Sequence, residues 1–301
     1  MKNNYASALS ASERVAWKLD DVFNQDAVLD FSQPFLPETL VDSAPLTWLS
    51  ATERRTLNQI RAHGYLSIFG LVEEFILPFV MQRLQARASA EMPERRALLG
   101  FAAEEAKHIE LFQRFKTVFR KGFGHACDVM GPASDIQAHV LAHSELSVGL
   151  LVLHIEWMTQ WHYVEMVRDD GELEPNFRRL LHEHWKEESQ HARIDGFIVE
   201  ALAEAATEQE RERAFREYLS LLAFLDAGLK QQVVFDRSAF ERATRRALSD
   251  AEAAQFMRVQ QQAQRRTYLG SGVNHPQLRA TVERIYPQGA RALRESSELY
   301  G

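Results

Sequence analysis

The 301-residue sequence contains a single cysteine, Cys127, so no disulfide can form within the chain. Small secreted proteins often depend on several disulfides, whereas reducing compartments disfavour them. The first 21 residues also lack the apolar segment that a secretory signal requires. Together, these two absences predict a cytoplasmic protein.

Long hydrophobic runs and an excess of positive charge are missing as well. The longest apolar runs, such as residues 148–153, are far shorter than the ~20 residues that span a bilayer. Acidic residues outnumber basic residues by 42 to 35, which gives a net charge of -7, and the two signs are interspersed along the chain. We therefore expect neither a membrane partner nor a nucleic-acid partner.

No segment alternates apolar and polar residues for long enough to predict a strand. Apolar residues recur instead with helical spacing, which predicts an all-α fold. Residues 24–49 hold three of the nine prolines and are expected to form an extended arm. The predicted helices cover residues 11–23, 50–84, 92–121, 134–169, 175–206, 208–235, 238–248 and 249–270, followed by one short helix from His275 and polar residues after Pro287. The four segments of roughly 30 residues are typical of an antiparallel bundle.

One predicted helix carries three possible metal ligands on its buried face. His184, Glu188 and His191 fall within about 60° of one another when each residue turns the helix by about 100°. The same face continues through Phe177 and Ile198, so the three side chains interrupt an apolar stripe. Burial of a carboxylate is costly unless a partner neutralises it. Imidazole and carboxylate are suitable ligands for iron, manganese and zinc, so a metal ion is the obvious partner.

A second predicted helix repeats this pattern. Glu105 and His108 form another Glu-x-x-His pair within an apolar stripe. Glu73 and Glu156 lie in the stripes of the two remaining long helices, and each precedes the glutamate of a Glu-x-x-His pair by 32 residues. Even two such pairs alone carry little weight in a chain rich in glutamate. The repeated spacing, however, predicts two similar helical hairpins that bring four carboxylates together.

This is the arrangement of ferritin-like di-metal carboxylate proteins, in which two helices supply a glutamate each and two supply a Glu-x-x-His pair. We therefore predict an all-α, ferritin-like four-helix bundle with additional N- and C-terminal helices. A single domain is expected over residues 1–301, with its core at about 50–206, an N-terminal arm at 1–49 and further helices at 207–301. The alternative is a set of solvated charges, which does not explain why the carboxylates lie on apolar faces.

Neighbouring acids leave some alternatives open. Glu74 competes with Glu73, although the repeat distance and the apolar stripe favour Glu73. Asp195 lies one turn beyond His191, where it would be either a hydrogen-bond acceptor for a ligand imidazole or an ordinary interhelical acid. Glu104 and Glu187 lie next to ligands but off their faces, and we expect them to meet solvent or neighbouring helices.

His184 distinguishes this set of ligands from the generic one, which has two histidines. The pattern His-x-x-x-Glu-x-x-His resembles the p-aminobenzoate N-oxygenase family of di-iron oxygenases, whose members are ferritin-like and similar in length. The resemblance implies that Glu105 and Glu188 reach both metals. It implies seven ligands: Glu73, Glu105, His108, Glu156, His184, Glu188 and His191. A buried histidine bonded to a carbonyl oxygen is the alternative for His184.

By the same resemblance, the cofactor is a pair of iron ions, with manganese possible, and the reaction is O₂-dependent oxidation of an amine to a hydroxylamine, nitroso or nitro product. The implied partners are O₂, a small organic substrate and an external electron donor, and a homodimer is expected. No basic side chain is evident as an anchor for a substrate carboxylate. C-hydroxylation, oxidative C–C cleavage, radical generation and iron handling remain alternatives.

Overall fold

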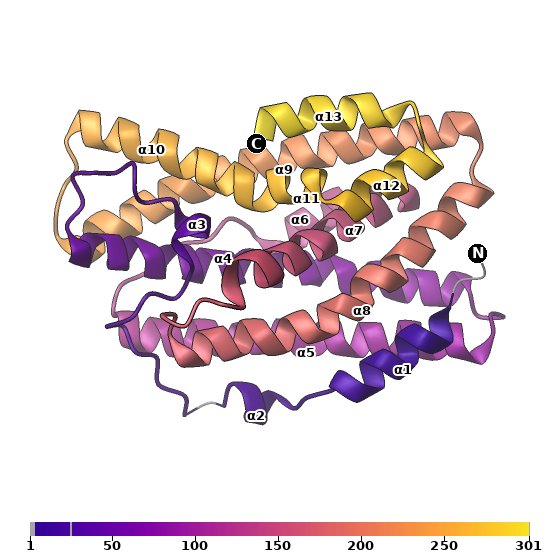
Figure 1. The fold of residues 1–301 in the computed structure, drawn as a ribbon, viewed down its shortest axis with the longest axis horizontal. Helices are drawn as coiled ribbons and strands as arrows, with labels where there is room; N and C mark the ends of the chain where they lie inside the picture. Colours follow the sequence, from indigo (N-terminus) through magenta and orange to yellow (C-terminus); the bar gives the residue numbers. More distant parts are fainter. Residues whose placement is uncertain (1–3, 25, 301) are drawn as a thin grey trace.

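The computed structural model describes residues 4–24 and 26–300, and within these ranges it contains helices and loops but no strand (Figure 1). The prediction of an all-α fold is therefore confirmed. The ends of the predicted domain, residues 1–3 and 301, lie outside the described residues, as does residue 25. The described helices pack around one contiguous apolar core.

Four long helices form the centre of the molecule, and sequence features explain where they begin. Ser50 and Glu53 form a capping box, in which each side chain bonds the backbone N–H of the other. Proline at the first turn opens the second and fourth helices. The second ends at Gly124, whose φ of 73° favours glycine. The four helices are α4 (Ala51–Ala86), α5 (Met92–Phe123), α7 (Glu145–His162) and α8 (Pro175–Ala205).

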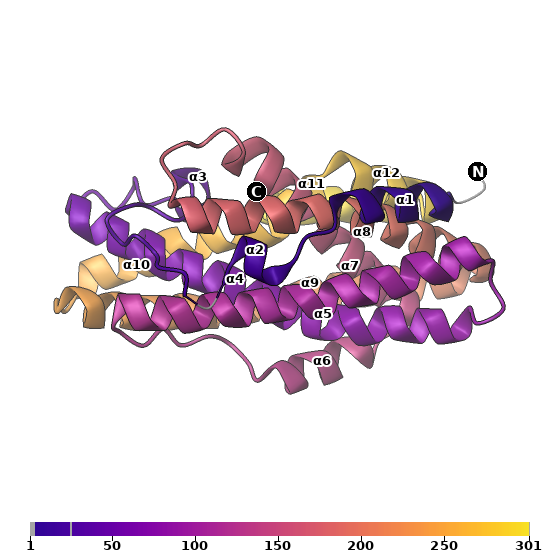
Figure 2. The same cartoon turned by 90° about the horizontal axis from the view of Figure 1, so that it is seen from below.

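The helix α4 is long and apolar enough by composition to cross a membrane. However, 67% of its most apolar window is buried inside the protein, as in the core helix of a bundle. It runs alongside α5, which Figure 2 shows from below.

The third long helix differs from its prediction. A continuous helix was expected over 134–169, but the structure has α6 (Ala133–Leu141), then α7, then the π-helical segment η1 (Tyr163–Val167). The break at Ser144 depends on a distant partner, because its backbone N–H donates to the Glu217 carboxylate at 2.9 Å and its hydroxyl bonds the same oxygen. Local sequence does not show this interaction, so the prediction was wrong at this point.

The C-terminal helices also differ from the predictions. A break was expected near residue 236, but α9 (Glu208–Thr244) is continuous, and the Ser238 hydroxyl bonds the backbone oxygen of Val234 within it. Only polar residues were predicted beyond Pro287, but the chain forms a further helix there, α13, which packs against η2 and α12. The remaining elements are α10 (Asp250–Arg265), η2 (Arg266–Gly270), α11 (Ser271–Asn274), α12 (Pro276–Ile285) and α13 (Gly289–Tyr300).

The N-terminal segment wraps the bundle. The helix predicted over 11–23 is replaced by α1 (Tyr5–Val15) and α2 (Leu19–Val22). From residue 26 to the start of α4, the one helix of the arm is the short α3 (Glu38–Val41). Asn58 of α4 fastens this arm, because its side-chain oxygen accepts from the N–H groups of Phe35 and Leu36 at 2.7 and 3.1 Å. The α1 helix packs on α5 and α8, whereas α9 packs on α4 and α7 (Figures 1 and 2).

Candidate metal centre

The seven predicted ligands meet inside the four-helix bundle. Each is at most 3% exposed. They come from α4 (Glu73), α5 (Glu105 and His108), α7 (Glu156) and α8 (His184, Glu188 and His191). The two hairpins implied by the sequence repeat thus direct their polar side chains toward a common interior.

Six of these side chains form two groups of possible donor atoms. One group consists of Glu73, His108, His184 and Glu188, and the other of Glu105, His108, Glu188 and His191. Within each group the donor atoms lie within 4.8 Å of one another. The groups share His108 and Glu188, so two metal ions held there would be neighbours. Mixed carboxylate and imidazole donors suit iron and manganese.

Several of these atoms are close together without being hydrogen-bonded. His108 Nδ1 lies 3.0 Å from Glu188 Oε1, and His191 Nδ1 lies 2.9 Å from Glu105 Oε1. Nevertheless, His108 Nδ1 and both Glu105 oxygens lack hydrogen-bond geometry. Buried polar groups are normally paired, so this arrangement fits donor atoms that converge on shared cations.

The third histidine lies inside the cluster. His184 Nε2 is 2.8 Å from Glu188 Oε1 and 3.1 Å from Glu73 Oε1. Its ring packs against Phe69 and Phe112, with centroids 5.7 and 5.1 Å away. The alternative of a bond to a backbone carbonyl has no counterpart among the contacts of the described residues.

The two remaining glutamates from the sequence repeat occupy different positions. Glu73 points inward, whereas its competitor Glu74 is half-buried and belongs to neither donor group. The charge of Glu188 acts on the Glu156 carboxyl, but Glu156 Oε2 has no hydrogen-bond partner and the residue lies outside both groups. Glu156 is therefore the one predicted ligand that belongs to neither donor group.

Charge explains why the cluster favours cations. Burial, together with the charges of neighbouring carboxylates, raises the pKa values of Glu73 and Glu156 well above the ordinary range. Burial acts in the same direction on Glu188, but His184 and His191 outweigh it and hold the pKa of that carboxyl well below its usual value. Divalent ions would balance the carboxylates in place of protons, so the residues present fit a dinuclear centre.

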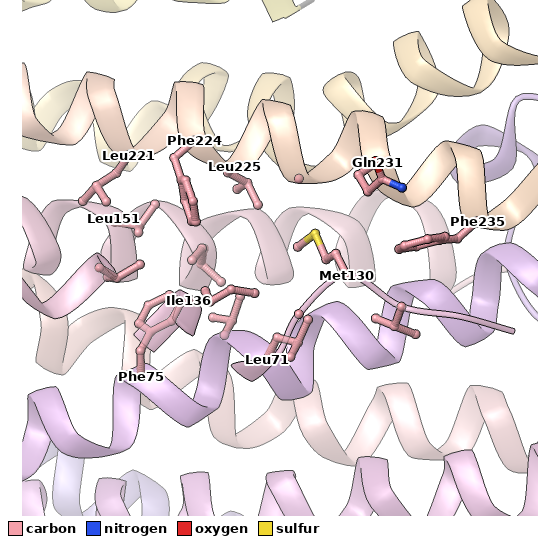
Figure 3. Close-up of a pocket in the computed structure, with 16 residues that line it drawn as sticks. Leu71, Phe75, Met130, Ile136, Leu151, Leu221, Phe224, Leu225, Gln231 and Phe235 are labelled. Carbon is pink, nitrogen blue, oxygen red and sulfur yellow. The ribbon is translucent and has the colours of Figure 1, made fainter. Parts of the chain in front are cut away.

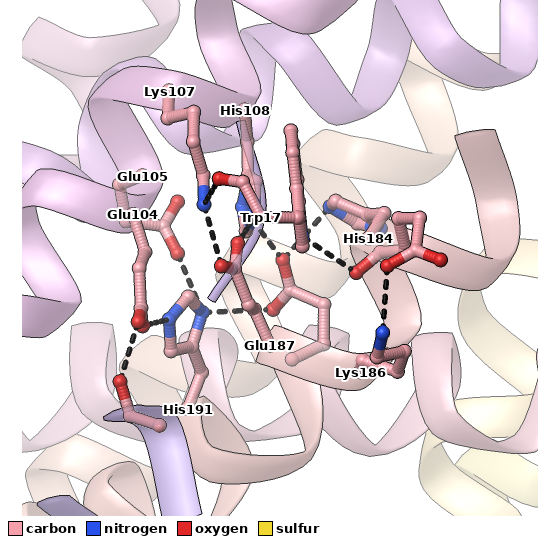
Figure 4. A network of polar contacts seen from close by, with 12 residues as sticks. Trp17, Glu104, Glu105, Lys107, His108, His184, Lys186, Glu187 and His191 are labelled. Atoms are coloured by element: carbon pink, nitrogen blue, oxygen red, sulfur yellow. Dashed lines mark hydrogen bonds and ion pairs between the residues drawn. The ribbon is translucent and has the colours of Figure 1, made fainter. Parts of the chain in front are cut away.

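Two acids that we expected to meet solvent or neighbouring helices do contact a neighbouring helix, where each orients a ligand imidazole. His108 donates from Nε2 to Glu187 at 2.8 Å, and His191 donates from Nε2 to Glu104 at 2.9 Å (Figure 4). Each bond runs from one Glu-x-x-His helix to the other. Such bonds fix the ring orientation and increase the basicity of the ligating nitrogen.

Asp195 does not provide the hydrogen bond considered for it. The residue is fully buried, but neither carboxylate oxygen has a hydrogen-bond partner among the described residues. Burial raises its pKa well above the ordinary value. His191 Nε2 donates its hydrogen bond to Glu104, and Nδ1 faces Glu105 and Glu188. Neither ring nitrogen is therefore directed to Asp195.

The N-terminal segment closes the histidine side of the cluster. Trp17 stacks on His108, with centroids 5.9 Å apart and planes inclined by 17°. Lys107 lies over the Trp17 ring, 3.8 Å from its centroid, and pairs with Glu187 at 2.5 Å (Figure 4). Lys107 thus compensates the buried Glu187 charge, a pairing between helices that no local pattern in the sequence indicates.

No protein-family model and no curated protein sequence matches this chain. Several solved structures are similar in fold. A point variant of an R2-like ligand-binding oxidase with an anaerobically reconstituted Mn/Fe cofactor is 13% identical, with a TM-score of 0.48 over 87% of this chain and 93% of the other. An R2-like ligand-binding oxidase with an aerobically reconstituted Mn/Fe cofactor is 14% identical, with a TM-score of 0.44 over 87% and 92%. At this level the similarity describes a helical architecture, so the function of the chain must be argued from its own cluster.

Proposed function

We propose that this protein is an O₂-dependent oxygenase with a dinuclear non-haem iron centre, in which manganese could replace one or both iron ions. The observation that carries the proposal is the pair of buried donor groups that share His108 and Glu188. When bound, two such metal ions would supply the electrons that reduce O₂. The seven ligands would be those named from the sequence, of which Glu156 alone lies outside both donor groups.

The protein's own residues would hold the metals, orient the ligands and exclude water. Carboxylates supply the negative charge that stabilises oxidised metal ions. Phe101 stacks on His191 at 4.0 Å, while Phe69 and Phe112 cover His184, so apolar rings enclose the imidazoles. Glu104 and Glu187 accept hydrogen bonds from Nε2 of His191 and His108. These bonds orient each ring so that Nδ1 points toward the cluster.

We further propose amine N-oxygenation as the reaction. The supporting observation is His184, which lies within the cluster where the resemblance to p-aminobenzoate N-oxygenases requires its third histidine. An added imidazole changes the charge and reactivity of the metal pair. C-hydroxylation or oxidative C–C cleavage on the same metals is the second candidate, and analysis of product masses distinguishes the two.

A radical-generating role is less well supported. It would require a tyrosine packed beside a ligand, yet the ring contacts of the three cluster histidines within residues 4–24 and 26–300 involve phenylalanine, tryptophan and other histidines. Tyr65, for example, bonds His162 at 2.8 Å, outside both donor groups. Iron storage predicts large shells, whereas we propose a homodimer, and light scattering tests this difference.

The test combines metal analysis with single-turnover chemistry. The purified protein is expected to bind two metal ions per chain. After reduction by an external donor, its absorption spectrum should change when O₂ is added. An amine substrate should then gain oxygen mass from ¹⁸O₂. Fewer than one ion per chain, or product oxygen that comes only from water, would contradict the proposal.

A further inference from the structure

Two hollows adjoin the loop that follows α5, and Val129 lines both. One is an apolar cavity of about 290 Å³ between α4, α6, α7 and α9, and none of its lining residues is charged (Figure 3). The other is an open pocket of about 470 Å³ between α4, α5 and the loop. No acid lines this second pocket, which we call the basic pocket, and its basic side chains are His63, Lys116, Arg120 and His125.

The two cations of the basic pocket have no counter-ion within the protein. In the part of the chain that the structure describes, the side chains of Lys116 and Arg120 form neither an ion pair nor a hydrogen bond. Glu74 attracts Lys116 but does not line the pocket, and Asp128 of the loop pairs with Arg242 at 3.2 Å. Burial of Lys116 lowers its pKa. An anion in the pocket would supply the missing counter-charge.

His63 adds a hydrogen-bonding group that the protein itself does not use. It lines the pocket and is only 7% exposed, yet neither ring nitrogen has a hydrogen-bond partner among the described residues. The ring packs against Phe119, with centroids 4.9 Å apart. Because buried polar groups are normally paired, the partner of His63 is expected to lie in the pocket.

The charge state of His63 indicates which partner it would take. Burial, aided by the charge of Lys116, lowers the His63 pKa to about 4, so the imidazole is neutral at pH 7 and carries one N–H donor. A cation in the pocket would be repelled by Lys116 and Arg120, whereas an oxyanion would be attracted by both and would accept from this N–H.

We propose that the basic pocket binds a small organic anion, whose carboxylate or phosphate group pairs with Lys116 and Arg120 and accepts a hydrogen bond from His63. Guanidinium and ammonium groups are common protein partners of both oxyanions. Phe119 and Val129 add apolar surface, so the ligand carries an apolar body beside its acid group. A dry cavity of about 150 Å³ holds benzene, so the pocket has room for a ring together with the acid group.

The basic pocket is separate from the metal centre. On α5, Lys116 follows His108 by eight residues, which is about 12 Å along the helix axis. On α4, His63 precedes Glu73 by ten residues, or about 15 Å. A one-ring anion bound beside Lys116 and His63 would not reach metals held by the cluster. The inference thus goes beyond the proposed oxygenase function and does not depend on it.

Calorimetry on the metal-loaded protein tests the charge selection with three probes that share a phenyl ring: phenylacetate, phenyl phosphate and the neutral phenylacetamide. We expect saturable binding of at least one anion at pH 7 and at least ~10-fold weaker binding of phenylacetamide. The anion that binds more tightly identifies the acid group as a carboxylate or a phosphate. Absence of binding by both anions, or equal binding of all three probes, would overturn the inference.

Substitutions of the two cations test the location, because carboxylates and phosphates can also bind metal ions. Lys116→Met keeps the apolar stem but removes the charge, and it should weaken anion binding at least ~10-fold. Arg120→Gln should weaken it about 3- to 5-fold, because Arg120 is exposed. Lys121→Gln is the matched control, since Lys121 is also exposed on α5 but does not line the pocket, and it should bind the anion as the wild type does.

Wild-type affinity in both Lys116→Met and Arg120→Gln would show that the anion binds elsewhere, and the inference would fail. The exposed position of Arg120 makes its variant the one expected to fold without difficulty, so the location is tested even if Lys116→Met does not fold.

A third pair of variants tests the hydrogen bond from His63. His63→Phe keeps a ring against Phe119 but removes both nitrogens, whereas His63→Gln keeps an N–H donor. We expect His63→Phe to bind the anion more weakly than His63→Gln does. Wild-type affinity in a folded His63→Phe protein would overturn the role assigned to His63.

Discussion

His191 and Glu104 lie on different helices of the bundle and are joined by a hydrogen bond of 2.9 Å from Nε2 to the carboxylate. His108 and Glu187 are related in the same way, with the roles of α5 and α8 exchanged. Each Glu-x-x-His helix therefore contributes a ligand histidine and also the acid that orients the histidine of the other helix. This reciprocity couples the two hairpins at the metal centre.

The reciprocal bonds predict a loss of metal affinity when one acceptor is removed. Glu104→Ala should weaken metal binding roughly 10- to 100-fold, because the His191 ring loses the bond that fixes its orientation. Glu104→Gln should retain part of the affinity, since its side-chain amide oxygen can still accept a hydrogen bond from His191 Nε2. Competition with a chelator measures both.

Asp195→Asn serves as the control, because Asp195 is another acid near His191 that is even more buried than Glu104 but bonds no imidazole. We expect its metal affinity to stay close to that of the wild type. A larger loss of metal affinity in Asp195→Asn than in Glu104→Ala would show that Asp195, and not Glu104, orients His191.

His184 is predicted to be essential for turnover. His184→Ala removes the imidazole that lies 2.8 Å from Glu188 and should abolish substrate oxidation and alter the absorption spectrum after O₂ addition. Stopped-flow spectroscopy and product analysis measure the two effects. Wild-type turnover in His184→Ala would remove the resemblance to p-aminobenzoate N-oxygenases as a guide to function.

His182→Ala is the matched control for this substitution. His182 lies two residues earlier on α8, but its side chain is 43% exposed and belongs to neither donor group. It should keep both the metal content and the spectrum of the wild-type protein.

Acid should destabilise the protein through His63. Burial, aided by the charge of Lys116, lowers the pKa of His63 from its usual 6.5 to about 4. Below pH 6.5 the unfolded chain therefore binds a proton that the folded chain rejects until about pH 4, and the free energy of unfolding falls through this window. The contribution is about 2 kcal/mol between pH 7 and pH 5.

Urea unfolding at pH 7 and pH 5 measures this effect as a difference between variants, because the metal cluster also responds to pH. His63→Gln should lose less stability on acidification than the wild type does. If the free energy of unfolding falls equally in the two proteins between pH 7 and pH 5, protonation of His63 does not cause the loss of stability.

The break before α7 should depend on Glu217. Glu217→Gln replaces the charged acceptor of the Ser144 N–H and hydroxyl, so we expect the free energy of unfolding to fall by about 1–2 kcal/mol. Glu212→Gln on the same helix changes only an exposed pair with Arg216 and should remain within about 0.5 kcal/mol of the wild type. Denaturant titration compares the two variants, and equal stabilities would contradict the role of Glu217.

Part of the cluster could be predicted because metal ligands leave local traces. A polar residue on an apolar helical stripe is visible in the sequence, and the equal spacing of Glu73 and Glu156 from the next pair links the two hairpins. The same repeat contained an unused indication of Glu104 and Glu187, because each directly precedes the glutamate of a Glu-x-x-His pair. Their role is an interhelical one, so it became evident only when α5 and α8 were placed together.

The sequence by itself determined the helical class, the starts of α4, α5 and α8, and the apolar helical faces on which the candidate ligands lie, since capping, proline position and helical periodicity are local properties. Only the tertiary structure decided that the third predicted helix breaks at Ser144 and that Glu104 rather than Asp195 accepts the hydrogen bond from His191 Nε2. It also decided that an uncharged cavity borders α4 and α7. The physical reason is that each of these features depends on a partner distant in the chain. Its position is fixed by packing of the core, which no local pattern encodes.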